Sequence, residues 1–308
     1  MDARDHLHVN LPSAREDAEH AQPEVVTPQT RSPSYRLAFA DQDFLLRDEL
    51  RPVRLQLELL KPELELQAHG IESTIVIFGS ARIAEPAIAR ARREEAERLA
   101  AQKPADKGLQ RQLKIARNLD RLSRHYEEAR RFGRLVAEAN RRNGTERFVI
   151  TTGGGPGVME AANRGALEAG ADTIGHNIVL PHEQAPNRYI TPELCFRFHY
   201  FALRKMHLLT RARALVIFPG GFGTMDELFE TLCLIQTGKA RPMPVLLFDA
   251  AYWKTLVNFE AMVDAGVIDE TDLDIFRFVE SAEEAWHAIE EHYREGKDEE
   301  RRADGPVA

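Results

Sequence analysis

Three glycine-rich turns contain residues whose types and spacing suit the binding of an anion. They are Gly79-Ser80, Gly153-Gly154-Gly155-Pro156-Gly157 and Pro219-Gly220-Gly221-Phe222-Gly223-Thr224, and each follows a short apolar run. Glycine lets backbone N–H groups approach a phosphate without a Cβ clash. A helix that starts after such a turn adds unpaired N–H groups and a partial positive charge. The pattern predicts a phosphate site at the ends of three strands.

The turns differ from the two commonest nucleotide-binding motifs. Position 158 is Val where the GxGxxG pattern needs a third glycine, and the chain has no GKT or GKS, which argues against a Walker A loop. One glycine turn alone is as easily a helix cap or a tight turn. Two strand-to-helix glycine turns in one sheet favour a ligand site.

Glu227 has two interpretations at the sequence level. Thr224-Met225-Asp226-Glu227 fits a capping box, in which the glutamate reaches back to the cap N–H group. Alternatively, Glu227 lies at the start of a helix beside an anion-binding turn and faces the ligand. Both interpretations stay open, and both can hold together.

Alternating strands and helices are the elements that would position these residues. The alternation predicts an α/β fold with a doubly wound parallel sheet and helices on both faces. Strands are expected at 73–78, 148–151, 173–180, 194–198, 214–218 and 244–248. Residues 82–142 are expected to be helical with one break at 104–108. Further helices are expected at 158–169, at 201–212 and from the third glycine turn to residue 236, and residues 252–294 should form two more.

Two segments precede this domain. Residues 1–35 are rich in Pro, Gln, Ser, Asp and Glu, which predicts a disordered or loosely docked tail. Residues 36–72 are expected to form an N-terminal helical extension, which Pro52 and Pro62 should kink or break.

The nucleotide-binding domain itself is expected at 73–294. It would contain a helical insertion at about 82–120, and a charged, frayed tail would follow at 295–308.

Composition narrows the class of protein. The 308 residues carry a net charge of -8, which argues against a general nucleic-acid partner. Cys195 and Cys233 are the two cysteines and have no metal-ligand spacing, so we expect a reduced, cytoplasmic protein. No apolar run approaches 18 residues, so no membrane span is expected.

Together these motifs resemble the LOG (Lonely Guy) family, long mislabelled as lysine decarboxylases. The family signature PGGxGTxxE is similar to residues 219–227, and an upstream Arg-Lys pair is similar to Arg204-Lys205. Residues 153–160 resemble a GGGxxGLM element but are one residue shorter, and Phe78-Gly79-Ser80 resembles the first phosphate-side turn. The resemblance covers about 73–290 and is closest to longer bacterial members.

The resemblance implies a Rossmann-like enzyme, usually dimeric, that acts on nucleoside 5′-monophosphates. It would release the free base and ribose 5-phosphate from AMP or a cytokinin riboside 5′-monophosphate, with no cofactor. Arg204 and Glu227 would be the catalytic pair. The residues implied in binding the phosphate or nucleotide are Gly79, Ser80, Gly153, Gly154, Gly155, Gly157, Met159, Glu160, Lys205, Gly220, Gly221, Gly223 and Thr224.

The side chains of the implied pair suit this chemistry. Cleavage of an N-glycosidic bond builds positive charge on the ribose, and a carboxylate at Glu227 could stabilise that cation or deprotonate the attacking water. Arg204 could orient Glu227 or bind the phosphate through its planar fork. We expect no metal site, because no HExxH motif is present. The histidines also lack ligand spacing: His176, His182, His199 and His207.

Two other functions compete with hydrolysis. A non-catalytic carrier of a nucleotide or of molybdenum cofactor could use similar turns, but it would not need both Arg204 and Glu227. A pyridoxal-phosphate decarboxylase ranks last, because no sequence context marks a Schiff-base lysine. The sequence names neither the base nor the size of the oligomer.

Overall fold

The computed structural model describes residues 13–21, 25–143, 148–180 and 185–303. Residues 1–12, 22–24 and 304–308 of the two predicted tails lie outside the described residues, and so does His182. The chain divides into one unit that ends at Leu59 and a second that begins at Leu60. Each unit is described by itself.

The first unit consists of short helical segments. Its elements are α1 (Ala14–His20), α2 (Gln42–Leu45), the first part of α3 (Arg51–Ala68), and 3-10 turns at Pro33–Tyr35, Ala38–Ala40 and Asp48–Leu50. We did not predict α1. It begins with a capping box, in which the Ser13 hydroxyl accepts from the Glu16 N–H group and the Glu16 carboxylate accepts from the Ser13 N–H group. None of its side chains is buried.

The region is divided near Pro52 as predicted, since α3 begins at Arg51, but α3 is not broken at Pro62. Pro52 lies in the first turn, where the missing N–H group would have had no partner within the helix. Pro62 lies inside the helix and is buried.

Seven parallel strands form one sheet in the second unit. Their order is β4-β3-β2-β1-β5-β6-β7, and every neighbouring pair is parallel. The predicted doubly wound parallel sheet is therefore confirmed. The strands are β1 (Ser73–Phe78), β2 (Phe148–Thr152), β3 (Thr173–Ile178), β4 (Cys195–Phe198), β5 (Ala212–Ile217), β6 (Val245–Phe248) and β7 (Phe276–Val279).

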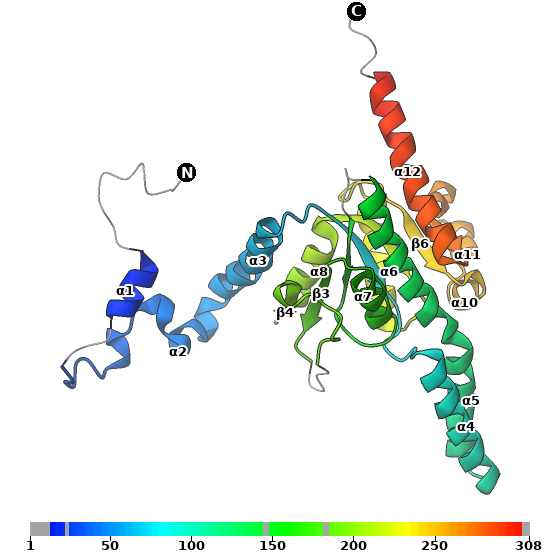
Figure 1. Ribbon diagram of the computed structural model, residues 1–308, viewed down its shortest axis with the longest axis horizontal. Helices are drawn as coiled ribbons and strands as arrows, with labels where there is room; N and C mark the ends of the chain where they lie inside the picture. The colour runs from blue at the N-terminus through cyan, green and yellow to red at the C-terminus, as the bar shows by residue number, and fades with distance from the viewer. Residues whose placement is uncertain (1–12, 22–24, 144–147, 181–184, 304–308) are drawn as a thin grey trace, which may run out of the picture. The chain divides into compact units, whose positions relative to one another are not determined.

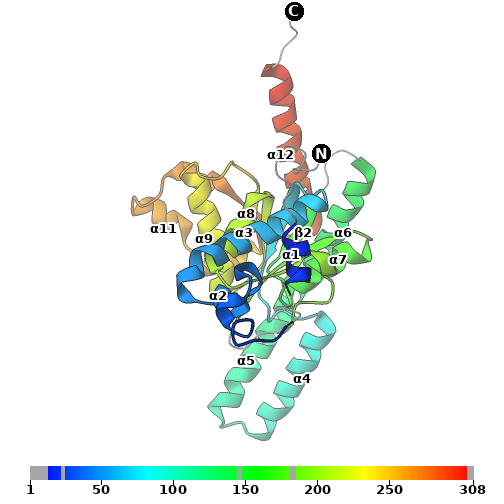
Figure 2. The ribbon, with the colours of Figure 1, turned by 90° about the vertical axis from the view of Figure 1, so that its left-hand side faces the viewer.

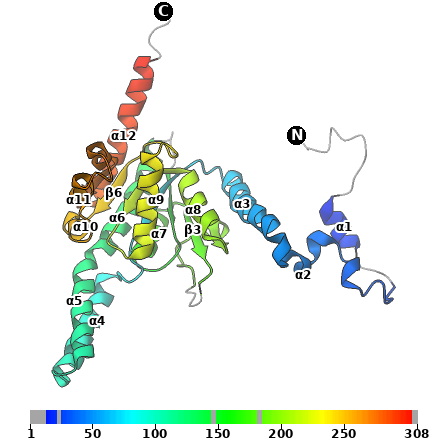
Figure 3. The ribbon, with the colours of Figure 1, turned by 180° about the vertical axis from the view of Figure 1, so that it is seen from behind.

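Helices cover both faces of this sheet because successive strand side chains point to opposite sides. Ile75 and Ile77 of β1 belong to the core beneath α6, α7 and α12 (Figure 1). Val76 and Phe78 belong to the core beneath α8 and α9 (Figure 3). The helices are α4 (Pro86–Gln102), α5 (Lys107–Leu122), α6 (Arg124–Asn143), α7 (Val158–Glu168), α8 (Phe201–Thr210), α9 (Phe222–Gln236), α10 (Ala250–Leu256), α11 (Phe259–Asp264) and α12 (Ala282–Ala303), with 3-10 turns at Pro192–Leu194 and Glu270–Ile275.

The helical region expected at 82–142 contains one more break than the sequence indicated. Besides the break before α5, that helix ends at Leu122 and α6 begins at Arg124. Ser123 marks this end, and its hydroxyl donates to the carbonyl oxygen of Asp120 at 2.6 Å. Serine favours helix ends because its side chain competes for backbone hydrogen bonds. Helices α4 and α5 lie side by side (Figure 2).

The C-terminal part also differs from the expectation of two helices. Strand β7 lies between α11 and α12, in a four-residue segment too short for its alternation to stand out. Helix α12 continues to Ala303, so it includes part of the predicted frayed tail. Among the described residues, no helix has both the length and the apolar character that crossing a membrane requires.

Candidate active site

The three glycine turns follow β2, β1 and β5, which are adjacent strands in the middle of the sheet. From β1 the chain continues outward on one side through β2, β3 and β4, and it then returns to form β5 on the other side. Ligands bind at such a switch point, beyond the carboxyl ends of the strands. A cavity of about 690 Å³ lies there, lined by the turns after β1 and β5.

Backbone contacts hold the three turns together. The Ser80 N–H group donates to the Pro219 carbonyl oxygen at 3.0 Å, and the Val158 N–H group donates to the Ser80 carbonyl oxygen at 3.3 Å. Gly157 has a φ of 73°, and a Cβ atom there would collide with the Ser80 carbonyl oxygen. Gly157 is therefore needed for the turns to pack.

Arg204 is held in a buried position on α8. Its Nε donates to the His176 carbonyl oxygen at 2.8 Å, and its Nη1 lies 3.5 Å from Oε1 of Glu227. A Cβ atom at position 153 would come within 2.5 Å of Nη2, so Gly153 makes room for the guanidinium. Burial lowers the pKa of Arg204, and Glu227 opposes that shift.

Glu227 lines the cavity on the second turn of α9. The N-cap of α9 is Gly221 and makes no side-chain cap bond, so Thr224 is the third helical residue. The capping-box interpretation of Glu227 is therefore wrong. Only 4% of Glu227 is exposed. Burial raises its pKa to about 7, against the opposing effect of Arg204 and then of Lys205. A carboxyl group with that pKa can both accept and give a proton near neutral pH.

The start of α9, which also lines the cavity, is suited to an anion. The first N–H groups of α9 have no partner within the helix, and the helix dipole adds partial positive charge at this end. Gly221 and Gly223 have open space where a Cβ would be, so the backbone there is accessible. Gly79, Ser80, Gly220 and Thr224 also line the cavity.

Apolar side chains form the remaining wall. Phe222 is 93% exposed. Leu119 and Leu122 of α5 line the cavity. The other apolar side chains that line it are Phe78, Ile83, Met159 and Phe201. Tyr252 also lines the cavity, and no motif in the sequence pointed to it.

Several predicted site residues do not line this cavity. The Lys205 ammonium pairs with Asp226 at 2.9 Å and with Glu230 at 3.0 Å. The carbonyl oxygens of Gly154 and Gly155 accept hydrogen bonds from the Asn187 side chain at 3.2 and 3.1 Å. The second glycine turn therefore supports the site through Gly153 and Met159, while Asn187 anchors the rest of the turn.

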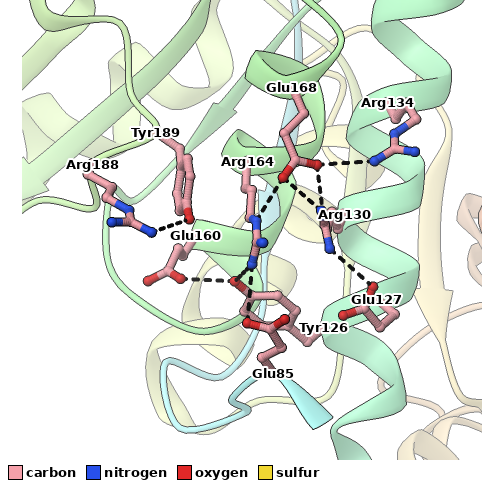
Figure 4. A network of polar contacts seen from close by, with 10 residues as sticks. All are labelled: Glu85, Tyr126, Glu127, Arg130, Arg134, Glu160, Arg164, Glu168, Arg188 and Tyr189. Atoms are coloured by element: carbon pink, nitrogen blue, oxygen red, sulfur yellow. Dashed lines mark hydrogen bonds and ion pairs between the residues drawn. The ribbon is translucent and has the colours of Figure 1, made fainter. Parts of the chain in front are cut away.

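Glu160 belongs to a separate polar network (Figure 4). Its carboxylate accepts a hydrogen bond from the Tyr126 hydroxyl at 2.9 Å. In the same network Arg164 pairs with Glu168 at 2.9 Å and with Glu85 at 3.2 Å. The Tyr126–Glu160 hydrogen bond joins α6 to α7, and the Arg164–Glu85 ion pair joins α7 to the residue before α4. These contacts therefore stabilise the packing of the helices.

Comparison with known proteins shows which proteins this chain is similar to. Residues 159–289 match the family described as "Possible lysine decarboxylase", and this range contains both Arg204 and Glu227. The cytokinin riboside 5′-monophosphate phosphoribohydrolase LOG7 of Arabidopsis thaliana is 30% identical over 148 residues, covering 47% of this chain and 66% of that protein. These matches confirm the resemblance of this chain to the LOG family. A further LOG-family relative, the probable phosphoribohydrolase LOG4 of Oryza sativa subsp. japonica, is 28% identical over 139 residues, covering 44% and 59% of the two chains.

The chain thus spans slightly less than two thirds of the length of these LOG-family relatives. Among solved structures, the Moco carrier protein from Chlamydomonas reinhardtii is 19% identical with a TM-score of 0.42, covering 73% of this chain and 99% of that one.

Proposed function

We propose that this chain hydrolyses the N-glycosidic bond of a nucleoside 5′-monophosphate, releasing the base and ribose 5-phosphate. The observation that carries the proposal is the buried Arg204–Glu227 pair, which shares one cavity with the start of α9. The naming of the LOG-family relatives as phosphoribohydrolases supports it.

In this proposal, the two ends of the substrate contact different parts of the cavity lining. The 5′-phosphate binds at the first turn of α9, where N–H groups and the helix dipole favour an anion. The base packs against the apolar side chains of α5 that line the cavity, Leu119 and Leu122. The ribose then lies between these ends, beside Glu227.

Glu227 acts on the ribose or on the attacking water. As a carboxylate it stabilises the positive charge that develops on the sugar, or it removes a proton from the water. We assign Arg204 the role of orienting this carboxylate. Its Nε atom is fixed by the hydrogen bond to the His176 carbonyl oxygen, and its Nη1 atom lies 3.5 Å from Oε1 of Glu227.

Base release from AMP and from adenosine, measured in the same buffer, tests the proposal. We expect free adenine and ribose 5-phosphate from AMP, with kcat/KM at least about 100-fold higher than for adenosine, because two or more charge-assisted hydrogen bonds to the phosphate are lost. Equal values would contradict a phosphate site. Binding of AMP without release of base would favour the carrier alternative, and a panel of other nucleoside monophosphates would identify the preferred base.

A further inference from the structure

Tyr252 contacts the third glycine turn from outside every recognised motif. It lies on α10, and its hydroxyl donates to the Gly220 carbonyl oxygen at 2.6 Å. The side chain is partly buried and lines the cavity beside the start of α9. A single side-chain hydrogen bond therefore fastens α10 to the turn between β5 and α9.

This bond fixes the orientation of one peptide group. In a trans peptide the C=O and N–H bonds point in opposite directions, and none of the described peptide bonds is cis. Holding the Gly220 oxygen toward Tyr252 therefore directs the Gly221 N–H group away from Tyr252. Glycines flank this peptide on both sides, so without the bond it could rotate and present its oxygen to an anion.

Asp249 in turn holds Tyr252 in place. One carboxylate oxygen of Asp249 accepts from the Tyr252 N–H group at 3.0 Å. The other lies 3.0 Å from both Nε2 of His125 and a guanidinium nitrogen of Arg124. Asp249 has a φ of 70° and is the one non-glycine residue with positive φ among the described residues. Such strain persists where the surroundings fix a residue firmly, and it is common near functional sites.

We infer that Tyr252 is a positioning residue, held by Asp249, that keeps the Gly220–Gly221 peptide in the orientation that binds a 5′-phosphate. The inference rests on the proposed function for the identity of the ligand. It assigns a role to α10, which carries no part of the family signature.

Tyr252→Phe tests this role because it removes only the hydroxyl. We expect KM for AMP and Kd for ribose 5-phosphate to rise about tenfold, the factor for one hydrogen bond to an ordered group. kcat should change less than about twofold, and kcat/KM for adenosine should stay the same, because adenosine has no phosphate. The matched control is Tyr293→Phe, in which a tyrosine loses its bond to the Arg213 carbonyl oxygen away from the cavity. It should behave as the unmodified protein.

A second variant tests whether Asp249 acts through Tyr252. Asp249→Asn keeps an oxygen for the helix cap and tolerates positive φ, but it loses the charge that Arg124 and His125 contact. It should raise KM for AMP less than Tyr252→Phe does. The double variant should be no worse than Tyr252→Phe alone, because both changes affect the same contact. Additive effects would overturn the linkage between the two residues.

Two outcomes separate this inference from the proposed function. Binding of ribose 5-phosphate can be measured by calorimetry without turnover. This measurement tests the role of the Tyr252–Gly220 hydrogen bond even if AMP is never cleaved. Unchanged Kd in Tyr252→Phe, or equal losses for AMP and adenosine, would overturn the inference whatever the activity of the protein.

Discussion

Burial next to an arginine gives the Glu227 carboxylate its proposed reactivity. Its pKa is about 7 in the folded protein, against 4.5 for an unperturbed glutamate. The folded state therefore binds more protons than the unfolded state between these pH values. It follows that the contribution of Glu227 to stability falls as pH rises from about 4.5 to 7 and changes no further above that.

The same shift predicts a pH profile for turnover. If Glu227 acts as a carboxylate, kcat should rise with pH and level off above about 7. Glu227→Gln keeps the shape but removes the charge, so kcat should fall by about 10²–10⁴ and lose this pH dependence. Steady-state kinetics between pH 5 and 9 would check both. Glu230→Gln is the matched control, since Glu230 lies on the same helix and pairs with Lys205. A Glu227→Gln protein that stays folded and active would contradict the assignment.

Arg204 should not be replaceable by lysine. The guanidinium contacts the His176 carbonyl oxygen and Glu227 through different nitrogens, and a lysine has only one. We expect Arg204→Lys to lower kcat by at least about tenfold, while Lys205→Arg on the same helix changes it little. Similar kcat values for the two variants would show that positive charge on α8 is all that matters.

The candidate residues were predictable where the signal is local. Glycine turns between apolar strands and helices predicted the candidate anion site, and the family signature predicted Arg204 and Glu227 as the candidate pair. Tyr252 was not predictable, because its contact with Gly220 joins residues 32 positions apart. Lys205 was misplaced because adjacent helical positions face different directions, so it pairs with α9 while Arg204 faces the cavity.

At the scale of elements, the helical insertion lines the cavity, which its sequence pattern did not predict. Helix α5 contributes Leu119 and Leu122 to the wall of the cavity that the glycine turns after β1 and β5 also line. An amphipathic pattern predicts that one face of a helix is buried, but it does not indicate whether protein or ligand buries that face. We therefore expect this insertion to influence which base is accepted.

Leu122→Ala tests this role. The smaller side chain removes apolar contact from the base, so KM for AMP should rise by about three- to thirtyfold, the range for losing a few methyl groups of contact. Kd for ribose 5-phosphate should stay the same. Ile115→Ala is the control, because Ile115 is on the same helix but 47% exposed and outside the cavity. Equal effects on AMP and ribose 5-phosphate would mean that Leu122 acts on the fold and not on the base.

Element boundaries were harder to predict than the element order. The breaks at Ser123 and around β7 depend on single hydrogen bonds and on pairing with β6, which the local pattern does not contain. The capping box failed for a similar reason. The sequence Thr-x-x-Glu fits at 224–227, but α9 starts earlier, at Phe222.

At the scale of the whole molecule, we predict a homodimer or a higher symmetric oligomer. Large apolar side chains outside the cavity remain exposed on α8 and α9, where Met206 is 43% and Phe229 36% exposed. Burying such surface is the usual driving force for association. Light scattering at micromolar concentration should give at least twice the chain mass of 34.9 kDa. A mass near that of one chain would contradict the prediction.

The sheet order also has a consequence for synthesis on the ribosome. Strand β1 lies at the centre, but its neighbour β5 begins at Ala212, which is 134 residues after Phe78. At roughly 5–20 residues per second, β1 waits about 7–27 s for that partner after it is made. During this interval one edge of a strand whose last four residues are apolar has no partner. Chaperones that shield nascent chains should therefore determine how much of this protein reaches its native state.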